Sequence, residues 1–415
     1  MRPSRPTRYH AAWVLPVATP PIRDGWVEVA GGVVTDVGAP ASLPRDRPAR
    51  TVHLPGHAVL PGLVNAHTHL ELSGLRGTVP RTRSMPEWAR AVMAGRARPS
   101  AGRAAAVGSA VDEMRGAGTA LVGDVANTHE SMAALRDGPV AAVVFREALG
   151  FDAGDAEAAA IGAALSAERA AGAGNHVRVA IAAHAPYSVS PALFRALAGA
   201  AGGGPRSVHV AESAEELELL RAGTGVWRAI LEERGRWGSD WVPPRSGPVA
   251  YLDALGWIGP RTLIVHGVHL TPTEIDRIAA AGATLVACPR SNAWTGAGTP
   301  PIARFYAAAG RVAVGTDSLA SAPDLNVFAE LSLMRRLAPS VPASALLASA
   351  TAVGASALGA GDRFGVIAPS RPASLIAVEL RGATDDVEEY LLSGIEPDCV
   401  TWLADLESGP GGPER

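Results

Sequence analysis

Residues 61–74, PGLVNAHTHLELSG, place two histidines, His67 and His69, directly after a short apolar run. In an extended strand alternate side chains share a face, so these imidazoles project together while Thr68 is turned away. The lead-in AVLPGLV is bounded by Pro and Gly and is typical of a buried strand. The stretch therefore predicts a strand that presents two metal-ligating nitrogens at its end. A short His-x-His also occurs by chance, so the rest of the chain must decide.

Eight apolar runs alternate with Ala-rich, helix-like stretches between residues 60 and 320. The runs are VLPGLVNAH, TALVGDVAN, VAAVVFREAL, HVRVAIAAH, RSVHVAE, TLIVHG, TLVACPRSN and VAVGTD. Strands of a parallel sheet are buried on both faces and have continuously apolar sequences such as these. Eight such strands separated by helices predict an α/β fold of the (β/α)₈ TIM barrel type.

The two ends of the chain show alternating strand patterns instead. We predict a small β-sandwich domain formed by the N- and C-terminal segments, residues 1–59 and 362–415, beside a barrel that spans residues 60–361. Residues 220–260 are rich in Trp and long for a strand-to-helix connection. Such a connection forms a wall or lid of the barrel mouth, unless its aromatic residues serve packing alone.

The composition of the 415 residues excludes several functions. A net charge of -3 gives no basic footprint for nucleic acid. All 37 basic residues are Arg, which excludes a Schiff-base lysine and a carbamylated lysine between metals. Two cysteines, Cys288 and Cys399, make no disulfide framework and favour a reducing, cytoplasmic location. Neither a secretory leader nor a membrane span is expected.

Polar side chains follow every apolar run. They are His67 and His69, Asp124 and Asn127, Arg146 and Glu147, His184, His209 and Glu212, His266, Ser291 and Asn292, and Asp317. Because the carboxyl ends of barrel strands share one face, these groups are expected to converge on one mouth.

Four of these side chains suit one divalent metal. His67, His69, His209 and Asp317 supply three nitrogens and one oxygen, the donor set of a catalytic zinc site that keeps a position open for water. We expect Zn²⁺ by default, and Fe²⁺ fits the same donors. Such an ion lowers the pKa of water toward ~7, and Asp317 would accept the proton that water loses.

Three further side chains are candidates for contact with the substrate. Glu212, three residues after His209, could move protons as a general acid, although an acidic residue also favours the first turn of the helix that begins SAEELELL. His266 could orient the attacking water, and His184 could contact the substrate. Either histidine, taken alone, could instead be structural.

The segments PGLVNAHTHLELS, HAPYSVS, HVAES, VHGVHL and GTDSLAS resemble, in this order, the amidohydrolase superfamily, and the resemblance covers essentially the whole chain. The pattern is similar to the mononuclear branch that deaminates nucleosides and nucleobases. This resemblance implies hydrolytic release of ammonia from a ring. It also implies metal ligation by the four residues above, ring protonation by Glu212, and steering of the attacking oxygen by His266 with Asp317.

Within this branch the chain resembles the deaminases of S-adenosylhomocysteine, methylthioadenosine and adenosine, and most of all those of aminodeoxyfutalosine in menaquinone biosynthesis. The segments HLELS, HAPYSVS, CPRSN and DSLAS carry the similarity. ACPRSN departs from the His-Asn-Pro-like segment usual in S-adenosylhomocysteine deaminases, and so favours the aminodeoxyfutalosine branch.

The resemblance also implies substrate contacts. Glu87, in MPEWAR, matches the acidic residue that grips the ribose hydroxyls, and His184 would touch the sugar. Arg146 and Arg290 are candidates to bind the distal benzoate, although each could equally be a structural ion-pair partner. Ser291 and Asn292, at the same strand end as Arg290, complete the predicted substrate-binding set.

Two other functions stay open at this point. A cyclic-amide hydrolase would use the same metal ligands, and a barrel that has lost its metal would be a non-enzymatic scaffold. The expected partner is a small-molecule nucleoside, with no nucleic acid and no membrane. A homodimer is left open.

Overall fold

The computed structural model describes residues 5–44, 48–97, 102–174, 176–238, 240–308 and 310–408. Eight strands form a parallel sheet in the order β13-β12-β11-β10-β9-β8-β7-β6. They are β6 (Leu63–Thr68), β7 (Thr119–Ala126), β8 (Ala141–Ala148), β9 (Val177–Ala183), β10 (Arg206–Val210), β11 (Thr262–His266), β12 (Thr284–Ala287) and β13 (Arg311–Val314). The first and last strands meet where Asp317 N donates to His67 O at 3.1 Å, so the barrel is nearly closed. The predicted (β/α)₈ barrel is confirmed, and each of the eight apolar runs contains one strand.

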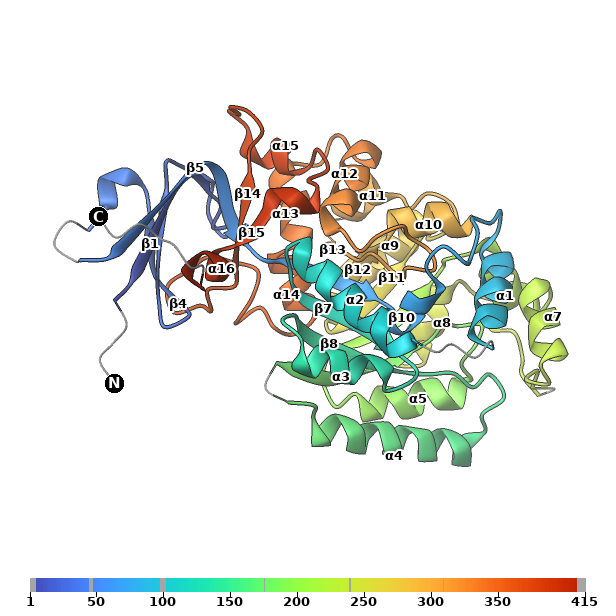
Figure 1. The fold of residues 1–415 in the computed structure, drawn as a ribbon. Helices are drawn as coiled ribbons and strands as arrows, with labels where there is room; N and C mark the ends of the chain where they lie inside the picture. Colours follow the sequence, from blue (N-terminus) through green and yellow to red (C-terminus); the bar gives the residue numbers. More distant parts are fainter. Residues whose placement is uncertain are drawn as a thin grey trace.

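Helices surround this barrel (Figure 1). They include α2 (Arg103–Gly116), α3 (Glu130–Asp137), α4 (Asp155–Ala171), α5 (Pro191–Ala200), α6 (Ala214–Ala222), α8 (Pro248–Ala254), α9 (Pro272–Ala280), α10 (Pro289–Thr295), α11 (Ile302–Ala307), α12 (Val327–Leu337), α13 (Ala343–Ser349) and α14 (Ala352–Ala357). Polar caps begin several of them. Ser190 caps α5, Ser213 caps α6, and Thr271 with Glu274 forms a capping box on α9. Among the described residues, no helix combines the length and hydropathy that a membrane span requires.

Segments from both ends of the chain form a second sheet beside the barrel (Figure 1). Its strands are β1 (Thr7–Val14), β2 (Ile22–Arg23), β3 (Trp26–Ala30), β4 (Val33–Gly38), β5 (Arg50–Pro61), β14 (Leu375–Glu379) and β15 (Val400–Trp402). The order is β15-β14-β5-β1-β3-β4, with β2 on β1. Short elements η1 (Pro40–Ser42), η3 (Pro397–Cys399), α15 (Val387–Leu391) and α16 (Leu403–Ser408) complete these segments.

The small domain is one seven-stranded sheet, where the sequence predicted a sandwich. A bridge between Val33 and Pro372 brings the segment before β14 against β4, the far edge of the sheet. The sheet therefore curves around a core that includes Tyr9, Val27 and Ala377. A β domain built from both ends is confirmed. Its predicted limits stay a prediction, and β5 runs on to Pro61, past the limit at residue 59.

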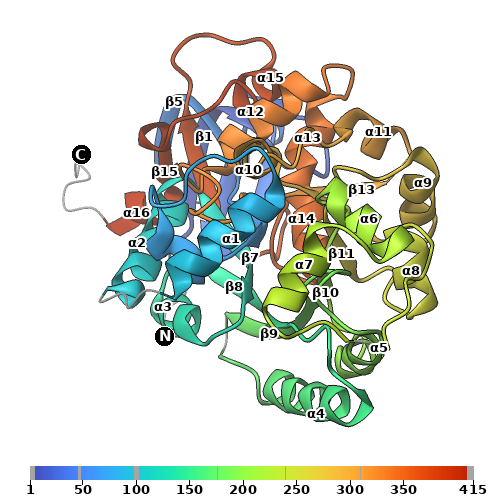
Figure 2. The same ribbon diagram turned by 90° about the vertical axis from the view of Figure 1, so that its right-hand side faces the viewer.

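Two helices cover the barrel mouth on the side away from the small sheet (Figure 2). They are α1 (Met85–Arg96) and α7 (Val226–Glu233), and both guanidinium nitrogens of Arg90 on α1 bond Glu233 on α7 at 2.6 and 3.2 Å. Helix α7 belongs to the Trp-rich segment 220–260, and its Trp227 stacks on Tyr187 with ring centroids 4.0 Å apart. The segment thus forms a wall of the mouth, and its aromatic residues also pack.

Candidate active site

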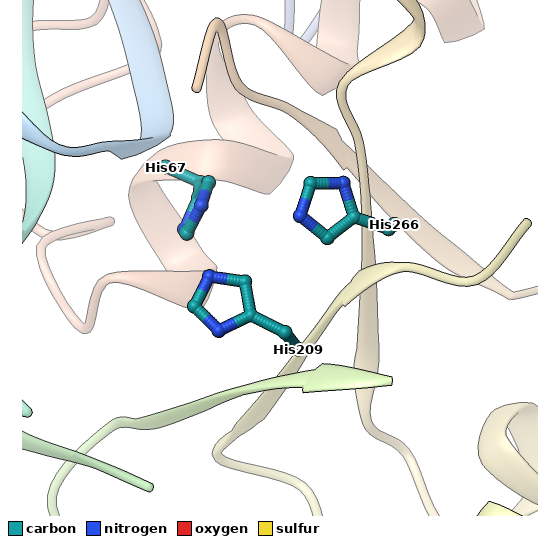
Figure 3. A group of neighbouring side chains, drawn as sticks. All are labelled: His67, His209 and His266. Atoms are coloured by element: carbon teal, nitrogen blue, oxygen red, sulfur yellow. The ribbon is translucent and has the colours of Figure 1, made fainter. Parts of the chain in front are cut away.

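Four histidines and one aspartate converge at the carboxyl ends of the strands. His67 lies on β6, His69 begins η2 (Leu70–Leu75), His209 lies on β10, and His266 ends β11. Figure 3 shows the rings of His67, His209 and His266 turned toward one another. Their centroids lie 5.0 Å apart for His67 and His209, and 5.8 Å apart for His67 and His266. Asp317, three residues after β13, completes the group.

The turns that carry these groups have backbone angles that L-residues rarely adopt. Ala211, His266 and Asp317 have φ values of 51°, 72° and 56°. Each such residue costs about 1–3 kcal/mol, and such residues cluster at functional sites. A hydrogen bond stabilises the strained turn at Asp317, because Thr68 Oγ1 donates to the carbonyl of Asp317 at 2.7 Å.

The donor set fits a divalent metal. His67 is 1% exposed, yet neither of its ring nitrogens has a hydrogen-bond partner among the described residues. Asp317 Oδ1 lies 3.8 Å from His67 Nε2 and 3.7 Å from His69 Nε2, and His209 Nε2 lies 3.3 Å from His69 Nε2. Burial lowers the pKa of His67 well below its usual range, so its imidazole is neutral. Neutral imidazoles and a carboxylate are ligands of zinc and iron.

Further hydrogen bonds orient these metal-ligating atoms. His209 Nδ1 donates to the carbonyl of His184 at 2.7 Å, which leaves Nε2 free as a ligand. Ser291 and Ser321 donate to Asp317 Oδ2 at 2.5 and 3.0 Å and leave Oδ1 directed at the histidines. Burial raises the pKa of Asp317, but His69, His266 and the Ser291 hydrogen bond outweigh it, and the pKa is lowered overall.

Metal removal tests this fit. We expect dialysis against a chelator to remove about one divalent ion per chain and to lower the Tm by several degrees. An ion at a thousand times its Kd stabilises a fold by about 4 kcal/mol. Calorimetry with metal analysis measures both, and added Zn²⁺ should restore the original Tm. A chain that melts at the same temperature with and without chelator, and carries no ion, would contradict the prediction.

His266 lies close enough to His67 and His209 to share a metal with them, but it has a hydrogen-bond partner of its own. Asn292 Nδ2 donates to His266 Nδ1 at 3.0 Å, so the neutral ring carries its proton on Nε2, which lies 3.5 Å from Glu212 Oε1. Burial lowers the pKa of His266 to about 4, although Asp317 acts in the opposite direction. This ring is therefore a hydrogen-bond donor into the site.

Glu212 is a buried carboxyl group beside these rings. It is 3% exposed, and burial, followed by the charges of Asp317 and Glu216, raises its pKa well above the usual range. This environment therefore favours the protonated form of Glu212. The alternative of a surface glutamate that opens α6 is wrong, because the side chain is enclosed.

Glu216 holds the turn that carries Glu212. Its side chain is fully buried, and its two oxygens accept hydrogen bonds from the backbone N–H groups of Ala211 at 2.9 Å and Glu212 at 3.3 Å. Ala211 is one of the left-handed residues, so the carboxylate stabilises a strained backbone. Sequence reasoning missed Glu216, since acidic residues are common in a first helical turn.

We expect Glu216→Gln to lower kcat about tenfold while the substrate KM stays within a few-fold. Glutamine has one acceptor oxygen, so one backbone N–H loses its partner, at a cost of about 1–3 kcal/mol. Steady-state kinetics at matched metal content measures the effect. The neighbouring Glu215→Gln variant is the control, and equal kcat values for the two variants would contradict the positioning role.

A cavity of about 440 Å³ opens above the histidines. Its floor is formed by His69, His209, Glu212, His266 and Asp317. One wall is apolar and comes from both mouth helices: Met85, Trp88, Ala89, Val92 and Met93 of α1, and Trp227, Ile230 and Leu231 of α7. The lining also includes polar side chains: Arg96 at the end of α1, Asn127, Glu147, His184 and Ser188, with Arg234 and Arg236 just after α7. His184 thus lies at the cavity, as predicted, with Nδ1 2.6 Å from Ser188 Oγ.

Glu87 does not line this cavity, and its expected contact with the sugar stays a prediction. Glu87 is exposed, its Oε2 accepts from Arg83 N at 3.3 Å, and it faces a separate surface hollow. The cavity-lining residues of α1 occupy one helical stripe that runs through Trp88 and Val92. Glu87 is off that stripe, so the helix turns it away from the cavity.

Both arginines expected to bind a carboxylate are engaged in ion pairs within the protein. Arg146 Nε lies 2.8 Å from Glu168 on α4, and its Nη1 donates to the carbonyl of Ala126 at 2.9 Å. Arg290 makes two hydrogen bonds of 2.7 Å to Asp324. Neither arginine lines the cavity, so the alternative of structural ion-pair partners is the one that these contacts support. Ser291 and Asn292 do not line the cavity either, and instead orient Asp317 and His266.

Glu147 and Arg96 line the cavity without having been assigned a role from sequence. Glu147 follows Arg146 on β8, and strand alternation sends the two side chains to opposite faces. With Arg146 turned outward to α4, Glu147 points inward. That alternation could have predicted that Glu147 faces the cavity. The position of Arg96 could not be predicted without knowing which face of α1 is turned toward the cavity.

Comparison with known proteins places the chain among metal-dependent hydrolases. A family model described as Amidohydrolase family matches residues 58–405. An aminodeoxyfutalosine deaminase from Deinococcus radiodurans is 35% identical over 356 residues, which cover 82% of each chain. A 5-methylthioadenosine/S-adenosylhomocysteine deaminase from Pelotomaculum thermopropionicum is 29% identical over 375 residues, covering 86% of this chain and 81% of the relative.

Solved structures agree with the fold. A zinc-bound adenosine deaminase from Xanthomonas campestris superposes with a TM-score of 0.79 at 28% identity, covering 95% of this chain and 90% of that one. Helicobacter pylori aminofutalosine deaminase, in complex with methylthio-coformycin, gives a TM-score of 0.82 at 24% identity, covering 93% and 95%. At that identity the second likeness shows the fold alone.

Proposed function

Since this chain belongs to the amidohydrolase family, and is a hydrolytic aminohydrolase, we propose that it deaminates adenine nucleosides, with aminodeoxyfutalosine as its substrate. The observation that carries the proposal is a pair of buried carboxyl groups with opposite pKa shifts: Glu212 raised and Asp317 lowered. Two carboxyl groups whose environments separate their pKa values serve as general acid and general base. Deamination of an aromatic amidine needs both.

The residues act in the following order in the proposed reaction. Glu212 gives its proton to the ring nitrogen as water adds to the carbon that bears the amino group. Asp317 accepts one proton from that water and returns it to the amino group, which leaves as ammonia. The remaining hydroxyl proton restores Glu212, and adenine has become hypoxanthine. His266, as a donor through Nε2, hydrogen-bonds the incoming oxygen.

The metal that His67, His69, His209 and Asp317 would hold supplies Lewis acidity and lowers the pKa of water. Zn²⁺ is the proposed ion, and Fe²⁺ is the alternative. The zinc-bound relative from Xanthomonas campestris supports zinc for this donor set.

The shape of the cavity favours a nucleoside with an apolar extension. Trp88 on α1 and Trp227 on α7 contribute to the apolar wall, which suits an aromatic substituent on the sugar. Arg96, Arg234 and Arg236 line the same cavity and replace Arg146 and Arg290 as candidates to pair with the benzoate of aminodeoxyfutalosine. The Deinococcus radiodurans relative supports this substrate.

A panel of substrates tests the proposal. Aminodeoxyfutalosine, methylthioadenosine, S-adenosylhomocysteine, adenosine and guanine are each followed by ultraviolet absorbance and by ammonia release. We expect the highest kcat/KM for aminodeoxyfutalosine. Equal values for methylthioadenosine or S-adenosylhomocysteine would assign the chain to the activity named for the Pelotomaculum thermopropionicum relative. Turnover of a cyclic amide, with none of any adenine nucleoside, would contradict deamination.

A further inference from the structure

Two tryptophans line the cavity and also contact the loops that carry the proposed acid and base. Trp88 on α1 and Trp227 on α7 belong to the apolar wall, and they are 9% and 4% exposed. A buried indole N–H usually finds a hydrogen-bond acceptor, so the choice of acceptor is the informative observation. Each of these two indoles donates to an acceptor beside a different carboxyl group of the proposed mechanism.

The indole of Trp88 contacts the loop that carries Asp317. Its Nε1 donates to the carbonyl of Ala320 at 3.0 Å. Ala320 lies inside a turn that is closed where Ser321 N donates to the carbonyl of Ser318 at 3.0 Å. Ser321 Oγ donates in turn to Asp317 Oδ2 at 3.0 Å. A shift of this turn would therefore move a hydrogen bond that orients the proposed base.

The indole of Trp227 contacts the turn that carries Glu212. Its Nε1 donates to the hydroxyl of Ser213, the next residue in the chain, at 3.2 Å. The same hydroxyl accepts from the backbone N–H of Glu216 at 3.2 Å and so caps α6. Glu216 then accepts from the backbone N–H of Glu212 at 3.3 Å. A continuous chain of contacts thus runs from the cavity wall to the proposed acid.

The wall that carries both indoles is held together by contacts of its own. The ion pair between Arg90 and Glu233 joins α1 to α7. Trp227 stacks on Tyr187 with ring centroids 4.0 Å apart, which restricts the rotation of its indole. The two N–H groups therefore have fixed directions, and such preorganised support keeps a catalytic group in its productive geometry.

We propose that Trp88 and Trp227 are positioning residues, each of which holds one of the two catalytic carboxyl groups through its indole N–H. The inference rests on the proposed function. It assigns the base, Asp317, to Trp88 and the acid, Glu212, to Trp227, in addition to the contribution of both rings to the apolar wall. Because a small misplacement of a reacting group lowers the rate of the chemical step, these contacts act on kcat.

Phenylalanine at either position keeps an aromatic ring in the wall and removes the N–H donor. We expect Trp88→Phe and Trp227→Phe each to lower kcat about three- to tenfold, the effect of one neutral hydrogen bond, with KM within a few-fold of wild type. Steady-state kinetics on the most active nucleoside, at matched metal content, measures both constants. If a phenylalanine variant does not fold, methionine at the same position replaces it.

Trp294→Phe is the matched control for these substitutions. Trp294 packs partly buried against the same apolar cluster, but it does not line the cavity. Its Nε1 has no hydrogen-bond partner among the described residues. The control should therefore keep the wild-type kcat, and a loss as large as that of Trp88→Phe would contradict a specific effect of the indole hydrogen bonds.

A double-mutant cycle tests which tryptophan serves which carboxyl group, because substitutions that act through one group do not add. The Glu212→Gln background has already lost the proposed acid. There Trp227→Phe should change kcat little further, whereas Trp88→Phe should still lower it about three- to tenfold. Full additional losses from both substitutions would overturn the assignment of Trp227 to the acid.

Other results decide between wall and positioning roles. A higher KM with unchanged kcat in both phenylalanine variants would leave the tryptophans as wall residues alone and overturn the inference, while the proposed function would stand. A wild-type chain without activity on any adenine nucleoside would instead refute the proposed function, and the two positioning roles with it.

Discussion

Asp317→Asn is expected to lower kcat/KM by about a thousandfold or more while the chain stays folded. In the proposed mechanism this one substitution removes a metal ligand, Asp317 Oδ1, and the base that accepts a proton from water. General acid–base catalysis alone contributes roughly 10²- to 10⁴-fold. The fold should persist because an amide oxygen can still accept from Ser291 and Ser321, which donate to Oδ2.

The measurement is steady-state deamination at saturating zinc, with metal content and Tm recorded on the same samples. Added zinc separates the two roles, since it can refill a weakened site but cannot replace the base. Asp324→Asn is a matched control in the same loop, where the carboxylate pairs with Arg290 and does not line the cavity. Activity within tenfold of wild type in Asp317→Asn would remove Asp317 from the mechanism.

The barrel could be predicted from sequence because each of its strands is marked by a local sequence pattern. The strands are buried over most of their length, as β7 is over all eight of its residues, and their sequences are predominantly apolar. Polar residues that end these runs then gather at the mouth, among them His209, His266 and Asp317. The order of the parallel strands follows the chain. The sequence could therefore predict that His67, His209 and His266 lie close together.

The arrangement of the small sheet could not be predicted, because its strands pair with partners that are distant in the sequence. Strand β5 pairs in parallel with β1 and antiparallel with β14, more than 300 residues away along the chain. No local pattern distinguishes that arrangement from two facing sheets. Alternation predicts a strand, whereas its neighbours follow from tertiary packing.

Substrate contacts were the least predictable part, because they depend on the direction of single side chains. Arg146 and Glu147 are adjacent, yet one contacts α4 and the other lines the cavity. Arg290 is bound by Asp324, a partner 34 residues away that no motif indicates. A resemblance gives the type of a residue and its place in the sequence, whereas the direction of its side chain depends on the fold.

Glu212→Gln is expected to lower kcat by about 10²- to 10⁴-fold while metal content and substrate affinity stay near wild type. Burial raises the pKa of the wild-type carboxyl group well above the usual range and so favours its protonated form. Glutamine is therefore close to isosteric and isoelectronic with the form it replaces, and it can donate a hydrogen bond to the ring nitrogen. It cannot transfer the proton, so the loss should fall on the chemical step and not on binding.

Single-turnover kinetics, with KM and metal content measured in parallel, separates these effects. Glu215→Gln, in the first turn of α6 just after Glu212, should behave as wild type. A Glu212→Gln variant that loses its metal and regains full turnover when zinc is restored would show that the glutamate is structural. Unchanged kcat with metal in place would mean that another group protonates the ring. Among the acidic residues of the cavity floor, only Asp317 would remain. Its lowered pKa makes Asp317 a poor proton donor at neutral pH. The opposite pKa shifts of these two carboxyl groups therefore make Glu212 the acid, and this variant is the direct test of that assignment.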